Sequence, residues 1–190
     1  MITRTAVKTH RAAQRVSGVL RKDGPVESAE DPDRQRIIAA ASQALAAVCG
    51  GDDDEAVQRL IGFVADSQDE HTDVRELVLL LFAECSTMVS ELSSGGETPV
   101  RMQVFDADGQ EVPIDKADPP VRTAVRTLLA EVHGDQDAAR EQVEIALANA
   151  APEDIATVLI QALRWTIRLA TECVERSLPV PEWVADAIEP

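Results

Sequence analysis

The chain has 190 residues, of which 45% are apolar and only 3% aromatic, and it contains no tyrosine. This length and composition exclude a disordered or fibrous protein and provide a core of Leu, Val, Ile and Ala. The net charge of −16 is uneven, because residues 1–22 hold six basic and no acidic residues, so the rest of the chain carries −22. A body this acidic repels phosphate backbones, which argues against general nucleic-acid binding by the core.

The cysteines and the hydropathy pattern indicate a cytoplasmic protein. Cys49, Cys85 and Cys173 lie far apart in apolar helical patterns, which is typical of buried, reduced thiols. No apolar run reaches the roughly 18 residues that a membrane span requires, and the basic N-terminus lacks the continuous apolar stretch of a secretory signal. The bias toward Ala, Val, Asp and Arg over Lys is typical of a high-GC bacterium or its phages.

The first 30 residues differ from the rest of the chain. Residues 3–21 predict a weakly amphipathic helix, because basic residues recur there every three or four positions, and residues 22–33 form a polar linker broken by Gly and Pro. We therefore separate residues 1–30, a basic segment that can stay disordered, from a single helical domain over 31–190. Residues 1–22 could touch nucleic acid only weakly, since no aromatic residue is available for stacking. Docking on the acidic body is the alternative.

Apolar periodicity and Gly, Pro and Asp signals predict six main helices. The first unit, residues 31–98, has helices at about 33–49, 53–66 and 72–92, with Asp33 as the expected first N-cap. The second unit, residues 118–190, has helices at about 119–133, 136–150 and 153–177, followed by a short helical tail. Residues 77–82 are apolar all round, which predicts a helix covered on several sides. The predicted fold is a mostly α helical bundle of two pseudo-repeated three-helix units with a short β-hairpin between them.

The two units look like copies of one another. Offsets of 84, 83 and 81 residues align Leu45 with Leu129, Asp52 with Asp135 and Phe82 with Leu163. Any two helical stretches rich in Ala, Leu and Val can be brought into similar agreement, so chance similarity remains the alternative to a duplication.

A connector over residues 99–117 interrupts the helices. Apolar and polar residues alternate from Val100 to Val104, Asp108 and Gly109 form a turn signal, and Pro113 marks the return strand as an edge. A hairpin of two strands alone is only marginally stable in water. A connection this long is commonly functional. We therefore expect a partner contact here, and a second one at the apolar tail. The candidate partner-binding residues are Arg101, Gln103, Phe105, Asp106, Asp108 and Trp183.

No metal or cofactor is predicted. Residues 106–109 resemble the opening of a calcium loop but lack its later ligands, and an Asp-Gly hairpin turn is the simpler interpretation. The histidines at 10, 71 and 133 lack metal-ligand spacing. Cys49 and His133 occupy equivalent places in the aligned units and could approach one another, but two ligands do not make a zinc site.

No catalytic residue is predicted either. The sequence contains no nucleophile elbow, glycine-rich phosphate loop or His-Glu-x-x-His motif. Three carboxylates lie on the longest predicted helices, and we expect them to face solvent or to pair with arginines at helical spacing. The carboxylates are Glu84, Glu91 and Glu172, and the arginines are Arg75, Arg164 and Arg168.

These observations favour a non-enzymatic macromolecular interaction protein, an adaptor or regulator whose acidic helical body binds a protein partner of unknown identity. The alternative is an acidic inhibitor or immunity-type protein that covers a basic enzyme such as a nuclease, since its charge would steer that encounter. A small enzyme with carboxylates inside the bundle is the third hypothesis. A homo-oligomer is compatible with each of them.

Overall fold

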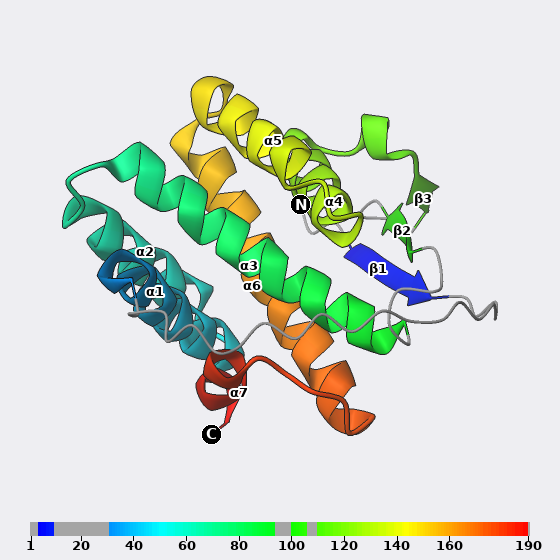
Figure 1. Ribbon diagram of the computed structural model, residues 1–190. Helices are drawn as coiled ribbons and strands as arrows, with labels where there is room; N and C mark the ends of the chain where they lie inside the picture. The colour runs from blue at the N-terminus through cyan, green and yellow to red at the C-terminus, as the bar shows by residue number, and fades with distance from the viewer. Residues whose placement is uncertain (1–3, 10–30, 94–99, 106–109, 190) are drawn as a thin grey trace, which may run out of the picture.

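A computed structural model of the protein describes residues 4–9, 31–93, 100–105 and 110–189 (Figure 1). Within these residues the fold is mostly α, with a small antiparallel sheet between the helical units, so the predicted fold class is confirmed. The first unit consists of α1 (Pro32–Cys49), α2 (Asp53–Ala65) and α3 (Glu70–Leu92). The second unit consists of α4 (Pro119–Val132), α5 (Gln136–Asn149) and α6 (Pro152–Glu175), and α7 (Glu182–Ile188) follows.

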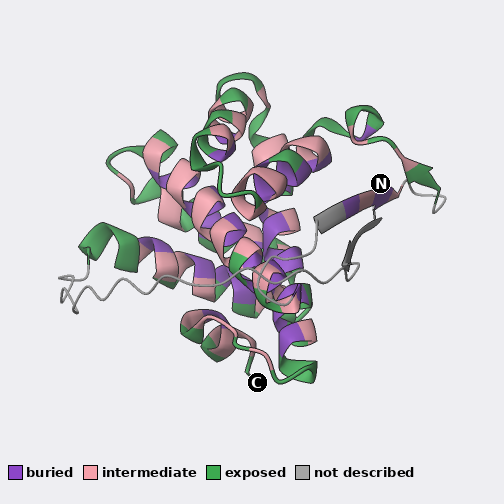
Figure 2. Ribbon diagram, turned by 45° about the vertical axis from the view of Figure 1, so that its right-hand side comes forward, coloured by how far each residue is buried: buried purple, intermediate pink, exposed green. Residues whose placement is uncertain are grey.

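The longest helices, α3 and α6, cross at the centre of the molecule (Figure 1). The hairpin of α1 and α2 lies on one side of them and the hairpin of α4 and α5 lies on the other. Both α1 and α4 contact both central helices, so the two units share one core. Figure 2 shows buried residues concentrated on the helix faces that meet in this core. In the run at residues 77–82, Leu77, Val78, Leu81 and Phe82 are buried, which confirms the prediction of a covered helix.

Large and small side chains interlock where α3 meets α6. The ring of Phe82 packs edge-on against Trp165 with 6.0 Å between the ring centroids, a favourable geometry for aromatic pairs. Ala162 is fully buried in α6, and its carbonyl accepts the Thr166 hydroxyl at 2.9 Å. The Cys85 Sγ lies 3.3 Å from the same Thr166 hydroxyl. Small residues therefore bring the two backbones close, and the aromatic pair fills the space beside them.

Equivalent turns follow α1 and α4. Gly51 and Gly134 both adopt positive φ angles, 84° and 74°, which favour glycine. The next residues, Asp52 and Asp135, are N-caps whose side chains accept N–H groups three residues ahead. Gly51 therefore corresponds to Gly134, one residue away from the predicted match with Gly50. Descent from a duplication stays a prediction.

The N-cap of α1 is Asp31, because its side chain accepts the Asp33 N–H at 3.1 Å. The prediction of Asp33 as the cap is therefore wrong by two residues. Pro32 occupies the first helical turn, where the lack of an N–H has no cost.

The predicted hairpin is present as β2 (Val100–Phe105) and β3 (Glu111–Val112), with Phe105 opposite Glu111. Its turn, at residues 106–109, lies outside the described residues. Met102 and Val104 are buried in the core, and β2 packs on α4. A short 3-10 helix, η1 (Ile114–Lys116), then leads into α4.

The sheet has a third strand, β1 (Arg4–Thr9), which pairs antiparallel with β2 in the order β1-β2-β3. The prediction of a helix over residues 3–21 is therefore wrong for residues 4–9, and residues 10–30 lie outside the described residues. The physical reason is that Thr5, Val7 and Thr9 alternate as β-branched residues and β2 offers them a partner. This pairing depends on residues almost a hundred positions away in the sequence, so periodicity within one segment could not reveal it.

The cooperativity of the shared core can be tested at Phe82, which is fully buried against α6. Phe82→Ala should lower the free energy of unfolding by about 3 to 5 kcal/mol and leave a single transition, since both units depend on this contact. Denaturant unfolding followed by circular dichroism and tryptophan fluorescence measures this.

The matched control is Val174→Ala, at an exposed position of α6, which should change the free energy by no more than about 0.5 kcal/mol. Two separate transitions, one of them unaffected by Phe82→Ala, would contradict a shared core.

Candidate functional site

An apolar groove of about 590 Å³ lies where the end of α2, the start of α3, the end of α5 and the start of α6 meet. Its floor consists of Leu60, Val74 and Leu159, which are buried in the core. Of the described residues that line it, only Glu70 and His71 have ionisable side chains, and all the others are apolar. Both helical units contribute to the groove, so it exists only when they pack together.

One wall of the groove is a stripe on α2. Val57, Leu60, Ile61 and Val64 follow the spacing i, i+3, i+4, i+7, which gathers apolar side chains on one helix face. Leu60 points into the core, whereas Ile61 is 54% exposed. The stripe is therefore wider than the surface that the other helices cover, and its outer part faces solvent.

The opposite wall comes from the second unit, through Leu147 of α5 and Ile155 of α6. Small residues keep the space between the walls open, because Ala65, Ala150 and Ala156 line it where larger side chains would fill it. An open apolar surface of this kind is a feature of binding sites in soluble proteins.

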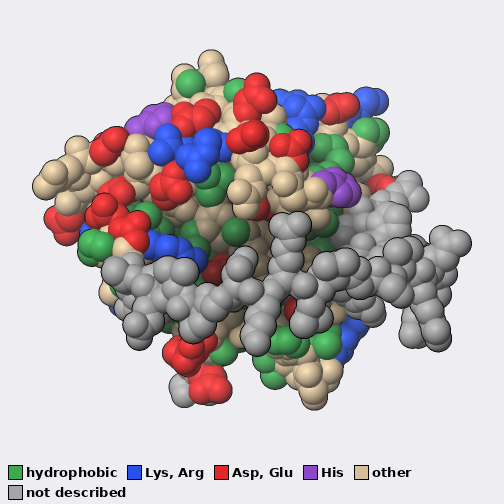
Figure 3. Space-filling model, viewed as in Figure 1, with side chains coloured by type: hydrophobic (Ala, Val, Ile, Leu, Met, Phe, Trp, Pro, Cys, Tyr) green, Lys and Arg blue, Asp and Glu red, His purple; other side chains and the backbone are tan. Residues whose placement is uncertain are grey.

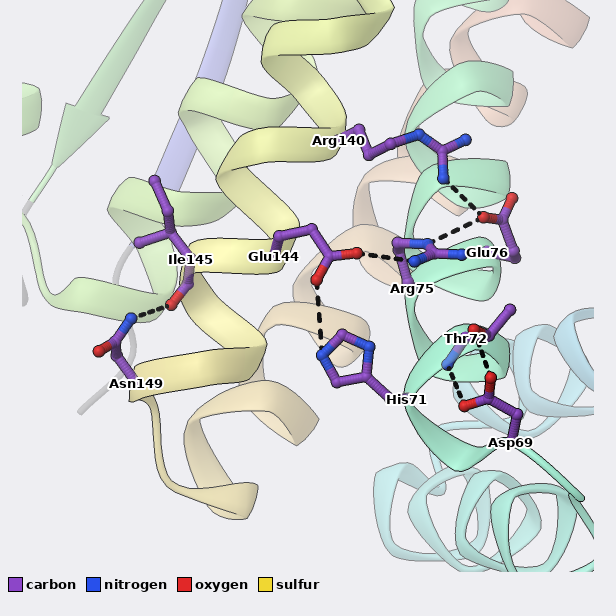
Figure 4. Close-up of polar contacts among 9 residues, drawn as sticks. All are labelled: Asp69, His71, Thr72, Arg75, Glu76, Arg140, Glu144, Ile145 and Asn149. Atoms are coloured by element: carbon purple, nitrogen blue, oxygen red, sulfur yellow. Dashed lines mark hydrogen bonds and ion pairs between the residues drawn. The ribbon is translucent and has the colours of Figure 1, made fainter.

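A chain of ion pairs borders the groove and joins α3 to α5 (Figure 4). The half-buried Arg75 guanidinium donates to Glu144 at 2.7 Å and to Glu76 at 3.0 Å. The Arg140 guanidinium of α5 also donates to the Glu76 carboxylate, at 3.0 Å. At its groove end, His71 Nε2 lies 3.5 Å from Glu144 Oε2. Arg75 lies between Glu144 and Glu76, and Glu76 lies between Arg75 and Arg140, so each of these four charges has a neighbour of opposite sign.

Hydrogen bonding within this chain stabilises the charged forms. The bond from Arg75 holds the pKa of Glu144 below its usual value, and the bond to Glu144 is the main cause of the raised pKa of Arg75. Arg75 and Glu144 are therefore structural ties between the units.

A buried carboxylate fixes the loop between α2 and α3, which connects the groove-lining residues Ala65 and Glu70. Asp73 accepts hydrogen bonds from Arg36 of α1 and from the Ser67 hydroxyl in the loop between α2 and α3. Burial alone would raise the pKa of Asp73, but these two hydrogen bonds outweigh it and hold the pKa below 3.8. The Arg36 guanidinium also lies 4.8 Å above the ring of Phe63, a cation–π contact that ties α2 to the same point.

The rim of the groove is acidic. Asp66, Asp69 and Glu153 are exposed and lie next to groove-lining segments in the chain. The Asp69 side chain accepts the Thr72 hydroxyl at 2.8 Å and the Thr72 N–H at 3.1 Å, and the hydroxyl is the main cause of its lowered pKa. On the face that Figure 3 shows, acidic side chains are scattered among basic and apolar ones. No Lys or Arg is among the described lining residues.

The predicted partner-binding residues do not form one site. Gln103 donates to Glu111 at 3.2 Å, and Phe105 is half-buried beside it. Arg101 stands opposite Lys8 in the sheet, whereas Asp106 and Asp108 lie outside the described residues. Trp183 is on α7, which packs on α1, and its indole N–H donates to Glu84 at 3.0 Å. The sheet packs on α4, so the structure separates the predicted residues of the hairpin from Trp183.

Two expectations about individual side chains are wrong. Cys85 and Cys173 are buried, but Cys49 is exposed because it is the last residue of α1. Burial raises the pKa of Cys85 to about 12, which leaves it a neutral thiol.

The expectation that the long-helix carboxylates face solvent or pair with arginines at helical spacing is wrong for Glu84, but it holds for Glu91, which is exposed, and for Glu172, which pairs four residues away. Arg164 pairs with Asp53 at the start of α2, and Glu172 pairs with Arg176. Glu84 accepts the Trp183 N–H instead of meeting an arginine. The partners of Glu84 and Arg164 come from distant helices, which spacing along one helix cannot identify.

The described residues contain no group of three or more His, Cys, Asp and Glu side chains that could hold a metal ion. Among the same residues, no helix combines the length and apolar character needed to cross a membrane. Comparisons with protein-family models, with curated proteins and with solved structures found no match.

The role of the Asp73 contacts can be tested by acid titration. Asp73→Asn should lower the free energy of unfolding at pH 7 by about 1.5 to 3 kcal/mol, because it removes charged hydrogen bonds from a buried site. Since the folded pKa lies below the ordinary value of 3.8, this stability is present above about pH 4 and is lost as the pH falls through the folded pKa. The difference from the wild type should therefore shrink in acid.

Denaturant unfolding of both proteins between pH 2 and pH 7 measures the effect. Asp53→Asn, which removes an exposed ion pair with Arg164, is the matched control and should cost less than about 1 kcal/mol. An Asp73→Asn difference that is constant over the whole pH range would contradict this account of the carboxylate.

Proposed function

We propose that the protein is a non-enzymatic macromolecular interaction protein, an adaptor or regulator, and that it binds its partner through the groove between α2, α3, α5 and α6. The observation that carries this proposal is the partly exposed apolar stripe of α2, with Ile61 more than half exposed on the wall of a groove to which both units contribute. Burying such a stripe against a partner removes apolar surface from water, which is the main favourable term in most protein associations.

The chemistry of the groove supports binding in preference to catalysis. Among the described lining residues the two ionisable ones are Glu70, which is exposed, and His71, which faces Glu144. A nucleophile with an adjacent base is the usual requirement for covalent catalysis, and no Ser, Thr or Cys is among these described residues. Apolar side chains with a charged rim are instead the usual composition of a protein-binding surface.

The second candidate is an acidic inhibitor of a basic enzyme, and the surface charge favours it. The first turn of α2 holds Asp53, Asp54 and Glu55, and the whole chain carries −16. Binding through such a surface would weaken steeply with salt, whereas binding through the apolar groove would persist.

The two candidate functions can be distinguished by measuring how much partner protein is retained on immobilised wild type and on immobilised variants. Ile61→Ser removes exposed apolar surface from the groove without changing the charge, and Val174→Ser makes a similar change at an exposed position of α6. We expect Ile61→Ser to weaken binding by about tenfold to a hundredfold, the effect of losing one buried aliphatic side chain of about 1.5 to 3 kcal/mol. Val174→Ser should bind normally.

Circular dichroism should show unchanged folding for both variants, since both positions are exposed. Partners should be retained in high salt if the groove is the binding site. Retention by Ile61→Ser equal to the wild type, together with loss at high salt, would contradict the proposal and support the inhibitor.

A further inference from the structure

We infer that the groove binds an amphipathic α-helix whose apolar face is flanked by basic side chains. The inference rests on the proposed function, because it names the class of partner for the same groove. It follows from two properties of the groove, namely its lack of groups to pair with an extended backbone and the sign of the charge at its rim.

The first property favours a helical partner. A segment buried in an apolar site must pair its backbone N–H and C=O groups, since each unpaired group is costly. The sheet, which could pair with an extended segment, packs on α4, and α4 contributes no described residue to the groove. A helix satisfies its own backbone and presents only side chains, so it can enter a surface built from four helices.

The second property favours basic flanks. Asp66, Asp69 and Glu153 are exposed beside the groove, and Glu70 lines it. The Arg75 guanidinium, one turn of α3 after the groove-lining His71, is already paired with Glu76 and Glu144. The rim therefore carries unbalanced negative charge, which attracts Lys or Arg on a partner and repels acidic segments.

The same charge argues against two other occupants. A second copy of the chain would bring another net charge of −16 to an acidic rim, which opposes association. A small apolar ligand would leave much of its surface in water, because the groove wall at Ile61 is 54% exposed, whereas small-ligand sites usually bury most of their ligand.

The shape of the groove suits the apolar face of a helix. Val57, Ile61 and Val64 form one wall, and Leu147 and Ile155 form the other. Side chains at i, i+3, i+4 and i+7 of a partner helix would lie between these walls above the buried floor, while basic residues on both edges of that helix would reach the acidic rim.

Fluorescence anisotropy with designed peptides tests the inference on the full chain. The first peptide, about 18 residues or five helical turns long, has leucines along one face and lysines on both edges. The second has Glu at every lysine position, and the third has the composition of the first with its leucines spread around the helix. We expect micromolar binding of the first peptide and at least about tenfold weaker binding of the others.

The variants show whether binding occurs at the groove. Ile61→Ser should weaken binding of the first peptide by about tenfold, and Val174→Ser should not change it. Equal affinity for the first and second peptides would overturn the charge part of the inference. If Ile61→Ser leaves the affinity for the first peptide unchanged, the peptide binds elsewhere on the acidic surface, and the assignment of the groove as its binding site is wrong.

The failure of the inference is distinguishable from the failure of the proposed function. If none of the peptides binds but Ile61→Ser still weakens the binding of natural partners, the inference of a helical partner is wrong and the groove remains a binding surface. If Ile61→Ser also leaves the binding of natural partners unchanged, the inference and the proposed function are both wrong.

Discussion

The packing of α3 against α6 is the contact on which the rest of the structure depends. Both helices are rich in buried apolar residues, and they contact one another more extensively than any other two helices do. Cys85 and Thr166 approach within 3.3 Å at this crossing, and Phe82 and Trp165 pack beside it. A unit of about 60 residues buries a smaller fraction of its surface than a domain of about 150 residues, so joining the units stabilises both.

The groove is a consequence of this crossing. The central helices pack closely, while the hairpins of α1 with α2 and of α4 with α5 lie on opposite sides of them (Figure 1). Where α3 and α6 begin, the ends of α2 and α5 face each other across the groove. Ion pairs from Arg75 to Glu144 and hydrogen bonds at Asp73 fix the elements around it. Its apolar walls are thus held by polar contacts that lie outside the groove itself.

The sequence predicts the helices well because their ends are marked by local chemistry. Asp52 and Asp135 cap helices that begin within one residue of the predicted positions, and Gly51 and Gly134 end the helices before them. The hairpin is also local, since alternation and an Asp-Gly turn are signals over a few residues. The stripe at Val57, Leu60, Ile61 and Val64 was visible too, but nothing in it indicates which half stays uncovered.

The features that the sequence does not reveal join distant segments. Arg75 and Glu144 are 69 positions apart, and Trp183 and Glu84 are 99 apart. The strand β1 pairs with β2, although the whole first unit lies between them in the sequence. The groove likewise requires side chains from four helices. Such features depend on how the units pack, and periodicity within one segment carries no information about that packing.

The central claim is that the seam between the units, at the groove, is the binding surface. Methyl NMR of the isoleucine-labelled full chain with the basic amphipathic peptide tests it directly, because isoleucines lie both in the groove and far from it. We predict chemical-shift changes concentrated on Ile61 and Ile155, which line the groove, with Ile114 of η1 and Ile167 of α6 unchanged. Changes concentrated on Ile114 or Ile167, or no change at any isoleucine, would contradict the claim.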